Sequence, residues 1–95
     1  EAAQRAPGVA RYAYVYALAL QGAGDTGGAL AVLEETNRRV PANRDILVAL
    51  VTIYRDQADL ARARAFADEM LERFPDDPQA SALREALDQP PSDER

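Results

Sequence analysis

The sequence predicts an all-α fold, a stack of about five antiparallel helices, and three observations support this prediction. Pro7, Pro41 and Pro75 recur at a constant interval of 34 residues, and a fixed interval of this size indicates repeated helical hairpins. The apolar residues inside each interval follow helical spacing and not the alternation of a strand. Residues that favour helix ends, mainly Asp, Asn and Gly, separate the apolar segments.

The interval divides the chain into two full repeats and a partial third. We predict a lead-in over 1–8, a first repeat over 9–43, a second repeat over 44–77, a capping helix over 78–88 and a disordered tail over 89–95. Proline and charged residues dominate the tail, so we do not expect it to pack.

The first repeat is expected to form two helices, over 9–21 and 26–39. The first is apolar on nearly every side, as expected for a helix that packs against more than one neighbour. Gly24 suits the left-handed backbone conformation that ends a helix, and Asp25 is a good N-cap for the second helix. Pro41 ends that second helix, because proline cannot donate the next backbone hydrogen bond.

The second repeat follows the same pattern, with helices expected over 44–56 and 60–73. Asn43 is the N-cap of the first helix and Asp59 that of the second. Pro75 ends the repeat, as Pro41 ends the one before it.

The turn of the second repeat differs from that of the first at one position. Ala58 stands where the first repeat has Gly24. A positive φ at this position strains Ala58 by about 1 kcal/mol, because its Cβ crowds the following carbonyl group. We therefore predict that Ala58→Gly stabilises the fold.

The capping helix over 78–88 begins with two strong signals, Asp77 as N-cap and Pro78 at the first helical position. The residues that we expect to be buried are Ala82, Leu83 and Leu87. Those that we expect to be exposed are Gln79, Arg84 and Glu85. A polar outer face predicts that this end of the stack is capped, whereas the N-terminal end is not.

Composition excludes several classes of function. The chain has no His and no Cys, which removes imidazole bases, thiol nucleophiles and the usual zinc and haem ligands. We therefore expect no cofactor, no metal site and no catalysis. The net charge is −5, which argues against binding to the phosphates of a nucleic acid. The longest apolar segment, 12–20, is far shorter than the roughly 20 residues that span a bilayer, so we expect no membrane insertion.

An acidic cluster stands in the second repeat. Asp68, Glu69 and Glu72 lie within two helical turns of one another, and Asp76 and Asp77 follow. We interpret these carboxylates as a solvated acidic face and not as a cation site, since charged residues are seldom buried without partners.

The pattern as a whole resembles the tetratricopeptide repeat, and the resemblance covers roughly residues 8–88. It rests on the 34-residue period and on the residues Gly24, Asp25, Ala29, Pro41, Ala63 and Pro75. The resemblance implies a right-handed solenoid of antiparallel hairpins whose first helices line a concave surface. In this family that surface typically holds a peptide or a helix of another protein, so the expected partner is a protein or peptide.

The resemblance also implies which residues contact the partner. On the first helix of each unit these are Arg11, Tyr14, Val15, Leu18 and Gln21, then Asp45, Val48, Ala49, Thr52 and Arg55, and finally Gln79, Ala82 and Ala86. Tyr14 is the expected anchor, although packing against an earlier repeat is an open alternative for this ring. Some family members grip a C-terminal carboxylate with Lys and Asn side chains. The corresponding positions here are Tyr14, Leu18 and Asp45, so that clamp is not expected.

Three functions remain open from the sequence. The first is a binding module. The second is an appended domain of a larger bacterial enzyme or multihaem cytochrome-like protein, because 11–20 and 43–50 resemble C-terminal repeats of some such proteins. The third is self-association into a homo-oligomer through an apolar N-terminal face near Tyr12 and Tyr16. The chain begins at Glu1 and not at Met, so we expect a fragment or processed form. We also expect a soluble bacterial protein, with the compartment open between cytoplasm and periplasm.

Overall fold

The computed structural model describes residues 2–41 and 43–88, with the surroundings of side chains from Val9 onward. Its five helices are α1 (Ala2–Gly22), α2 (Thr26–Arg39), α3 (Arg44–Asp56), α4 (Leu60–Arg73) and α5 (Pro78–Asp88). The predicted all-α fold is therefore confirmed. The tail that we expect to be disordered lies outside the described residues.

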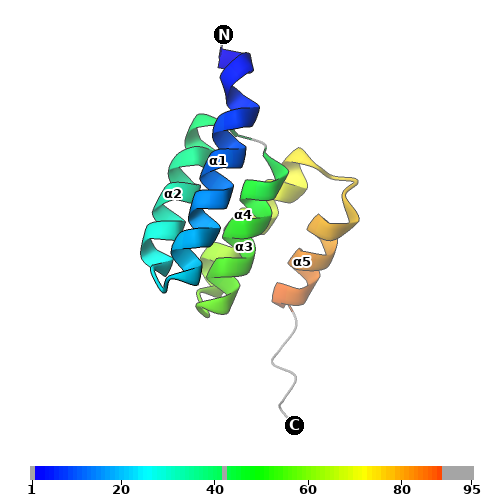
Figure 1. The fold of residues 1–95 in the computed structure, drawn as a ribbon. Coiled ribbons are helices and arrows are strands. Elements are labelled where there is room, and N and C mark those ends of the chain that lie inside the picture. Colours follow the sequence, from blue (N-terminus) through cyan, green and yellow to red (C-terminus); the bar gives the residue numbers. More distant parts are fainter. Residues whose placement is uncertain (1, 42, 89–95) are drawn as a thin grey trace.

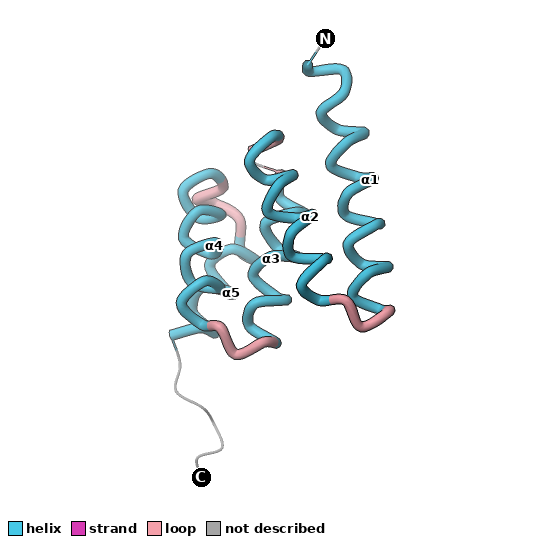
Figure 2. Tube along the Cα trace, turned by 90° about the vertical axis from the view of Figure 1, so that its left-hand side faces the viewer, coloured by secondary structure: helices cyan, strands magenta, loops and turns pink. Residues whose placement is uncertain are grey.

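The helices form a row of antiparallel hairpins (Figure 1). Each helix packs against the next one along the chain, and α3 also contacts α1 and α5. In the view turned by 90°, the hairpin α1–α2 stands beside the hairpin α3–α4, with α1 at one edge (Figure 2). The first helices of successive repeats are therefore neighbours, which allows them to share one surface.

The N-caps of three helices are those predicted. The side chains of Asp25, Asn43 and Asp59 each accept a hydrogen bond from the backbone N–H three residues further on, at 2.9, 3.1 and 3.2 Å respectively. These bonds satisfy amide groups that have no partner inside the helix. The bounds of α2 to α5 agree with the predicted ranges.

The start of α1 was predicted wrongly. The helix begins at Ala2 and not at Val9, and Pro7 lies inside it. Pro41 follows α2 and Pro75 follows α4, so only these two prolines end a helix in the described residues. A proline in the second turn removes a single backbone donor, and its fixed φ is close to the helical value. The first turns of α1 consequently project beyond the rest of the stack (Figures 1 and 2).

Small and aliphatic side chains fill the space between the helices. Fully buried alanines on the first four helices are Ala17, Ala29, Ala63 and Ala67. The largest fully buried side chains on α3 are Ile46, Leu47, Leu50 and Val51. Because α3 contacts α1 and α2 as well as α4 and α5, it supplies more of the core than any other helix in the described residues.

Two predictions for α5 were wrong. Arg84, which was expected to be exposed, is half-buried between Asp68 and Asp88. Ala82 is exposed, whereas Ala80 is fully buried against the rest of the stack. Two residues correspond to about 200° around a helix, so these two side chains point to nearly opposite faces. Leu87 is buried and Leu83 half-buried, as expected.

The turns that end α1 and α3 have the same backbone conformation. Gly24 has a φ of 91° and Ala58 a φ of 63°. In both turns the amide of the following Asp donates to a carbonyl five residues back, at 2.8 Å for Asp25 and 2.9 Å for Asp59. Ala58 is therefore a non-glycine residue held in the left-handed region by the helix-ending turn.

Ala58→Gly is expected to raise the free energy of unfolding by up to about 1 kcal/mol, because release of the left-handed strain exceeds the entropy that glycine adds to the unfolded chain. Thermal unfolding followed by circular dichroism measures the effect, which corresponds to a few degrees in Tm. Gln57→Gly is the matched control, since Gln57 has a φ of −84° and glycine there brings only the entropic cost. An unchanged or lower Tm for Ala58→Gly contradicts the prediction.

Candidate functional site

A hollow opens where the first helices of the two repeats meet. It has a volume of about 400 Å³. Its lining residues are Ala10, Arg11, Tyr14, Val15, Asn43 and Asp45, and we call this hollow the groove. The groove combines a tyrosine, an aliphatic side chain and charges of both signs. Such a lining suits a polypeptide segment that has apolar and polar side chains.

Each side of the groove is held by packing or capping. Tyr14 is half-buried and packs against the main core cluster, in which Ala10 is also buried. Asn43 is the N-cap of α3, and its side-chain carbonyl accepts a hydrogen bond from the amide of Ile46 at 3.1 Å. Arg11 and Asp45 occupy the same position in the two repeats and are both exposed. The groove is therefore built on helix positions that packing and capping hold in place, and its charged side chains are exposed.

The structure thus brings together Arg11, Tyr14, Val15 and Asp45 from the predicted contact residues. Ala10 and Asn43 also line the groove but were not among the predicted contact residues. The spacing of Ala10 and Tyr14, one helical turn apart, was a usable signal for the first of them.

The other predicted contact residues lie outside the groove. On α1, Leu18 is exposed and Gln21 half-buried. On α3, Val48 packs against a small cluster that contains Met70 and Ala80, and the Thr52 hydroxyl donates to the Ala49 carbonyl at 3.1 Å.

The remaining residues of that set fall into three environments. Arg55 lies 3.8 Å from Asp56 at the end of α3, and the Gln79 side chain accepts a hydrogen bond from Arg44. Ala82 and Ala86 are exposed on α5. Ala49 is only 5% exposed, so the expectation that it contacts a partner was wrong, because α3 has neighbours on more sides than α1.

Charged pairs connect α5 to the second repeat. Arg44, at the start of α3, donates hydrogen bonds to Asp77 and Gln79. The hydrogen bond from Arg44 holds the pKa of Asp77 below its usual range. Arg84 donates to Asp68 and Asp88. Asp68, Asp77 and Asp88 are thus paired with arginine. Within 2–41 and 43–88 no group of three potential metal ligands comes together.

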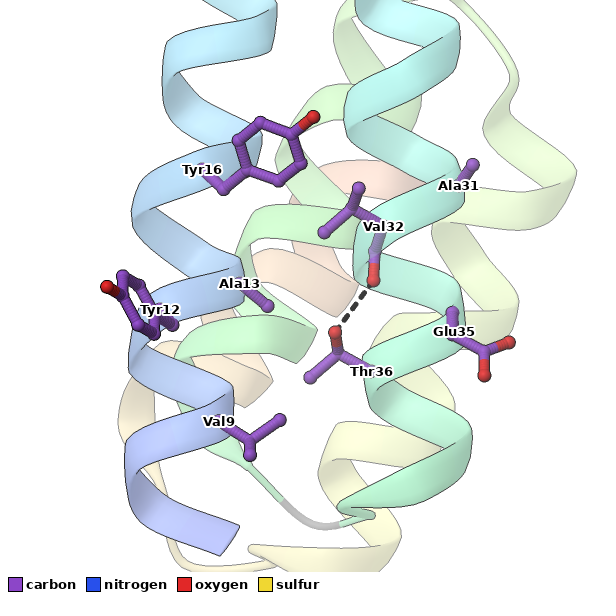
Figure 3. A pocket seen from close by; sticks show the side chains of 8 residues that line it. All are labelled: Val9, Tyr12, Ala13, Tyr16, Ala31, Val32, Glu35 and Thr36. Carbon is purple, nitrogen blue, oxygen red and sulfur yellow. Dashed lines mark hydrogen bonds between the residues drawn. The ribbon is translucent and has the colours of Figure 1, made fainter. Parts of the chain in front are cut away.

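A second and larger hollow lies on the open side of the first repeat, between α1 and α2. Its volume is about 630 Å³. Its lining residues are Val9, Tyr12, Ala13, Tyr16, Ala31, Val32, Glu35 and Thr36, and we call this surface the end face. Figure 3 shows the Tyr16 ring lying towards Val32, with Val9, Ala13 and Thr36 below it between the two helices.

The end face is apolar and open. Tyr12 is 80% exposed and Tyr16 57% exposed, and such large apolar groups in one place mark interaction surfaces. The Thr36 hydroxyl is satisfied within α2, because it donates to the Val32 carbonyl at 2.8 Å. Glu35, at the margin, accepts hydrogen bonds from Arg38 and Arg39, and these lower its pKa.

An apolar face near Tyr12 and Tyr16 was predicted from the sequence, but the part of the end face on α2 was not. On α2 the end-face residues Val32 and Glu35 stand next to the buried residues Leu33 and Thr36. A helix that packs on two sides has no simple polar face, so the sequence pattern does not reveal this half. None of the helices in 2–41 and 43–88 combines the length and hydropathy of a membrane span.

Comparison with known proteins identifies the repeat. A family model described as "Tetratricopeptide repeat" matches residues 20–87. Comparison with the curated proteins and with the solved structures gave no significant match. The matched region contains the turn at Gly24, the helices α2, α3 and α4, and all but the last residue of α5. The chain therefore belongs to the tetratricopeptide repeat family.

Proposed function

We propose that this protein binds a segment of another protein in the groove between α1 and α3. Tetratricopeptide repeats are in general non-catalytic modules of protein–protein interaction. The observation that supports the proposal is the hollow itself, in which Arg11, Tyr14 and Asp45 come together from two repeats.

The lining suggests what kind of segment fits. Tyr14 and Val15 offer apolar contact area, and tyrosine gives much of it at a low entropic cost. Arg11 and Asp45 have opposite charges on adjacent helices, so a segment with one acidic and one basic side chain is favoured in a single direction. Asp45 disfavours a chain-terminal carboxylate, and we therefore propose an internal segment as the ligand.

Tyr14→Ala is expected to weaken binding at least about tenfold, because truncation of an anchoring aromatic residue typically costs more than 1 kcal/mol. Peptides selected on the full chain from a random library supply the ligand, and calorimetry measures the affinity of each variant. Arg11→Glu is expected to weaken the same peptides without unfolding the protein, since Arg11 is exposed.

Leu60→Ala is the control, because Leu60 is an exposed aliphatic residue of α4 outside the groove. It is expected to leave the affinity unchanged. Selected peptides that bind Tyr14→Ala and Arg11→Glu as tightly as the unmodified chain contradict the proposal.

The other functions raised by the sequence remain predictions. The family match covers a repeat that is compatible both with an independent module and with a domain of a larger enzyme or cytochrome-like protein. No contact in the described residues favours one of these over the other.

A further inference from the structure

The two repeats differ most in the exposure of equivalent side chains. Tyr12 and Tyr16 of α1 stand 34 residues before Ile46 and Leu50 of α3. The two tyrosines are 80% and 57% exposed, whereas Ile46 and Leu50 are completely buried. The second repeat has the hairpin α1–α2 packed on this side, and no other described residue covers the same side of the first repeat. The end face is therefore a repeat-to-repeat contact surface that is open.

The structure contains one example of how such a surface is covered. On the second repeat the covering helix is α2, whose buried Leu33 and half-buried Leu30 belong to the same core cluster as Leu50. Polar contacts flank this apolar stripe. The Tyr54 hydroxyl donates to Glu34, and the Asn37 side chain donates to Glu69 of α4 at 3.3 Å.

The end face has a carboxylate at the position that accepts a hydrogen bond in this contact. Glu35 stands 34 residues before Glu69, the residue that accepts the bond from Asn37. Glu35 lies at the margin of the end face (Figure 3) and receives its hydrogen bonds only from Arg38 and Arg39 of its own helix among the described residues. The apolar floor and the carboxylate thus have the same arrangement as in the contact that α2 makes with the second repeat.

We propose that the end face binds an amphipathic α-helix of a partner protein, in the position that α2 takes on the second repeat. The helix has aliphatic residues at positions i and i+3, like Leu30 and Leu33. It has an amide side chain at i+7, like Asn37, which donates to Glu35. This site is separate from the groove and does not depend on the function proposed for it.

A second copy of the chain fits the end face less well. Its own α2 stripe is already buried against α3. The opposite end of its stack is α5, where Ser81, Glu85 and Asp88 are exposed and Arg84 is engaged with Asp68. The end face of a second copy is itself apolar, but no Asn or Gln is among its lining residues, so it has no amide side chain to donate to Glu35.

The test uses a synthetic helix that copies residues 25–40. A lactam bridge joins the positions of Gly28 and Val32, on the side opposite Leu30 and Leu33, because an unconstrained peptide of this length is barely helical in water. Circular dichroism verifies its helicity, and calorimetry measures its binding to the full chain. We expect saturable binding that Tyr12→Ala and Tyr16→Ala together weaken at least about tenfold, and no binding of a bridged peptide with Leu30 and Leu33 replaced by Ser.

Two control variants separate this site from others. Leu60→Ala changes an exposed aliphatic residue outside the end face, and Arg11→Glu changes the groove. Both are expected to bind the helix as the unmodified chain does. Loss of peptide binding with Arg11→Glu, or no binding of the verified helix to the unmodified chain, overturns the proposal. Neither result alters the peptide selection that tests the groove.

A double-mutant cycle tests the register. Asn37→Ala in the peptide and Glu35→Ala in the chain are expected to weaken binding by less in combination than the sum of their separate effects, as for two groups in contact. Additive effects overturn the proposed register.

Sedimentation of the full chain over a range of concentrations tests whether a second copy of the chain covers the end face. Dimerisation that Tyr16→Glu abolishes overturns the proposal in favour of a second copy.

Discussion

Leu50→Ala is expected to lower the free energy of unfolding by about 3 kcal/mol, since it removes a completely buried side chain and leaves a cavity. Leu50 lies on α3, which packs against every other helix of the described stack. Small domains have a total stability of roughly 5–15 kcal/mol, so this loss is a large fraction of the whole. Urea unfolding at about 25 °C, followed by the negative circular dichroism signal of the helices, measures it.

Tyr16→Ala is the matched control, because Tyr16 occupies the same repeat position as Leu50 on the exposed end face. We expect the free energy of unfolding to change by less than about 0.5 kcal/mol, as for most surface substitutions. A loss comparable to that of Leu50→Ala means that the end face is covered in solution, which contradicts the exposure seen in the structure.

Stability is expected to fall by on the order of 2–3 kcal/mol between pH 10 and pH 12 because of Tyr54. The pKa of Tyr54 is raised from 10.0 to about 12, mainly because its hydroxyl is buried and also because this hydroxyl donates a hydrogen bond to the Glu34 carboxylate. In that interval the unfolded chain releases the phenol proton while the folded chain retains it. Protons therefore favour the folded state, and the contribution is complete below pH 10 and lost as the pH rises to the folded pKa.

Tyr54→Phe isolates this contribution. Phenylalanine keeps the ring that stacks on Phe66, with centroids 5.9 Å apart, but has no proton to lose. Urea unfolding at a series of pH values is expected to show a shallower decline for Tyr54→Phe than for the unmodified chain. Equal slopes for the two proteins contradict the assignment, and tyrosinate absorbance reports the titration directly.

Local chemistry determined much of the fold. Asp25, Asn43 and Asp59 mark helix starts because a short side chain with an acceptor oxygen can bond a free backbone amide three residues on. The turn at Ala58 was predictable as well, since the repeat aligns it with Gly24 and the backbone conformation there follows from the way the preceding helix ends. Such features depend on a few consecutive residues, and the sequence contains all of them.

Positions that depend on neighbours in space were harder to predict. Ala80 and Ala82 have the same side chain, so only the placement of α5 on α3 and α4 decides which of them is buried. The same holds for Ala49, which sequence reasoning placed on the concave surface. In the groove, Arg11, Tyr14 and Asp45 were predicted through the family resemblance, whereas Asn43 was identified only as a cap.

By itself, the sequence determined the 34-residue period, the helical hairpins, their caps and the turn conformation, because each of these follows from the backbone preferences of adjacent residues. Only the tertiary structure decided which apolar residues are covered. Tyr16 and Leu50 share one repeat position, yet one is exposed and the other buried. Burial is a property of what packs against a helix, and α3 has a preceding hairpin on the side where α1, in the described residues, has an open face.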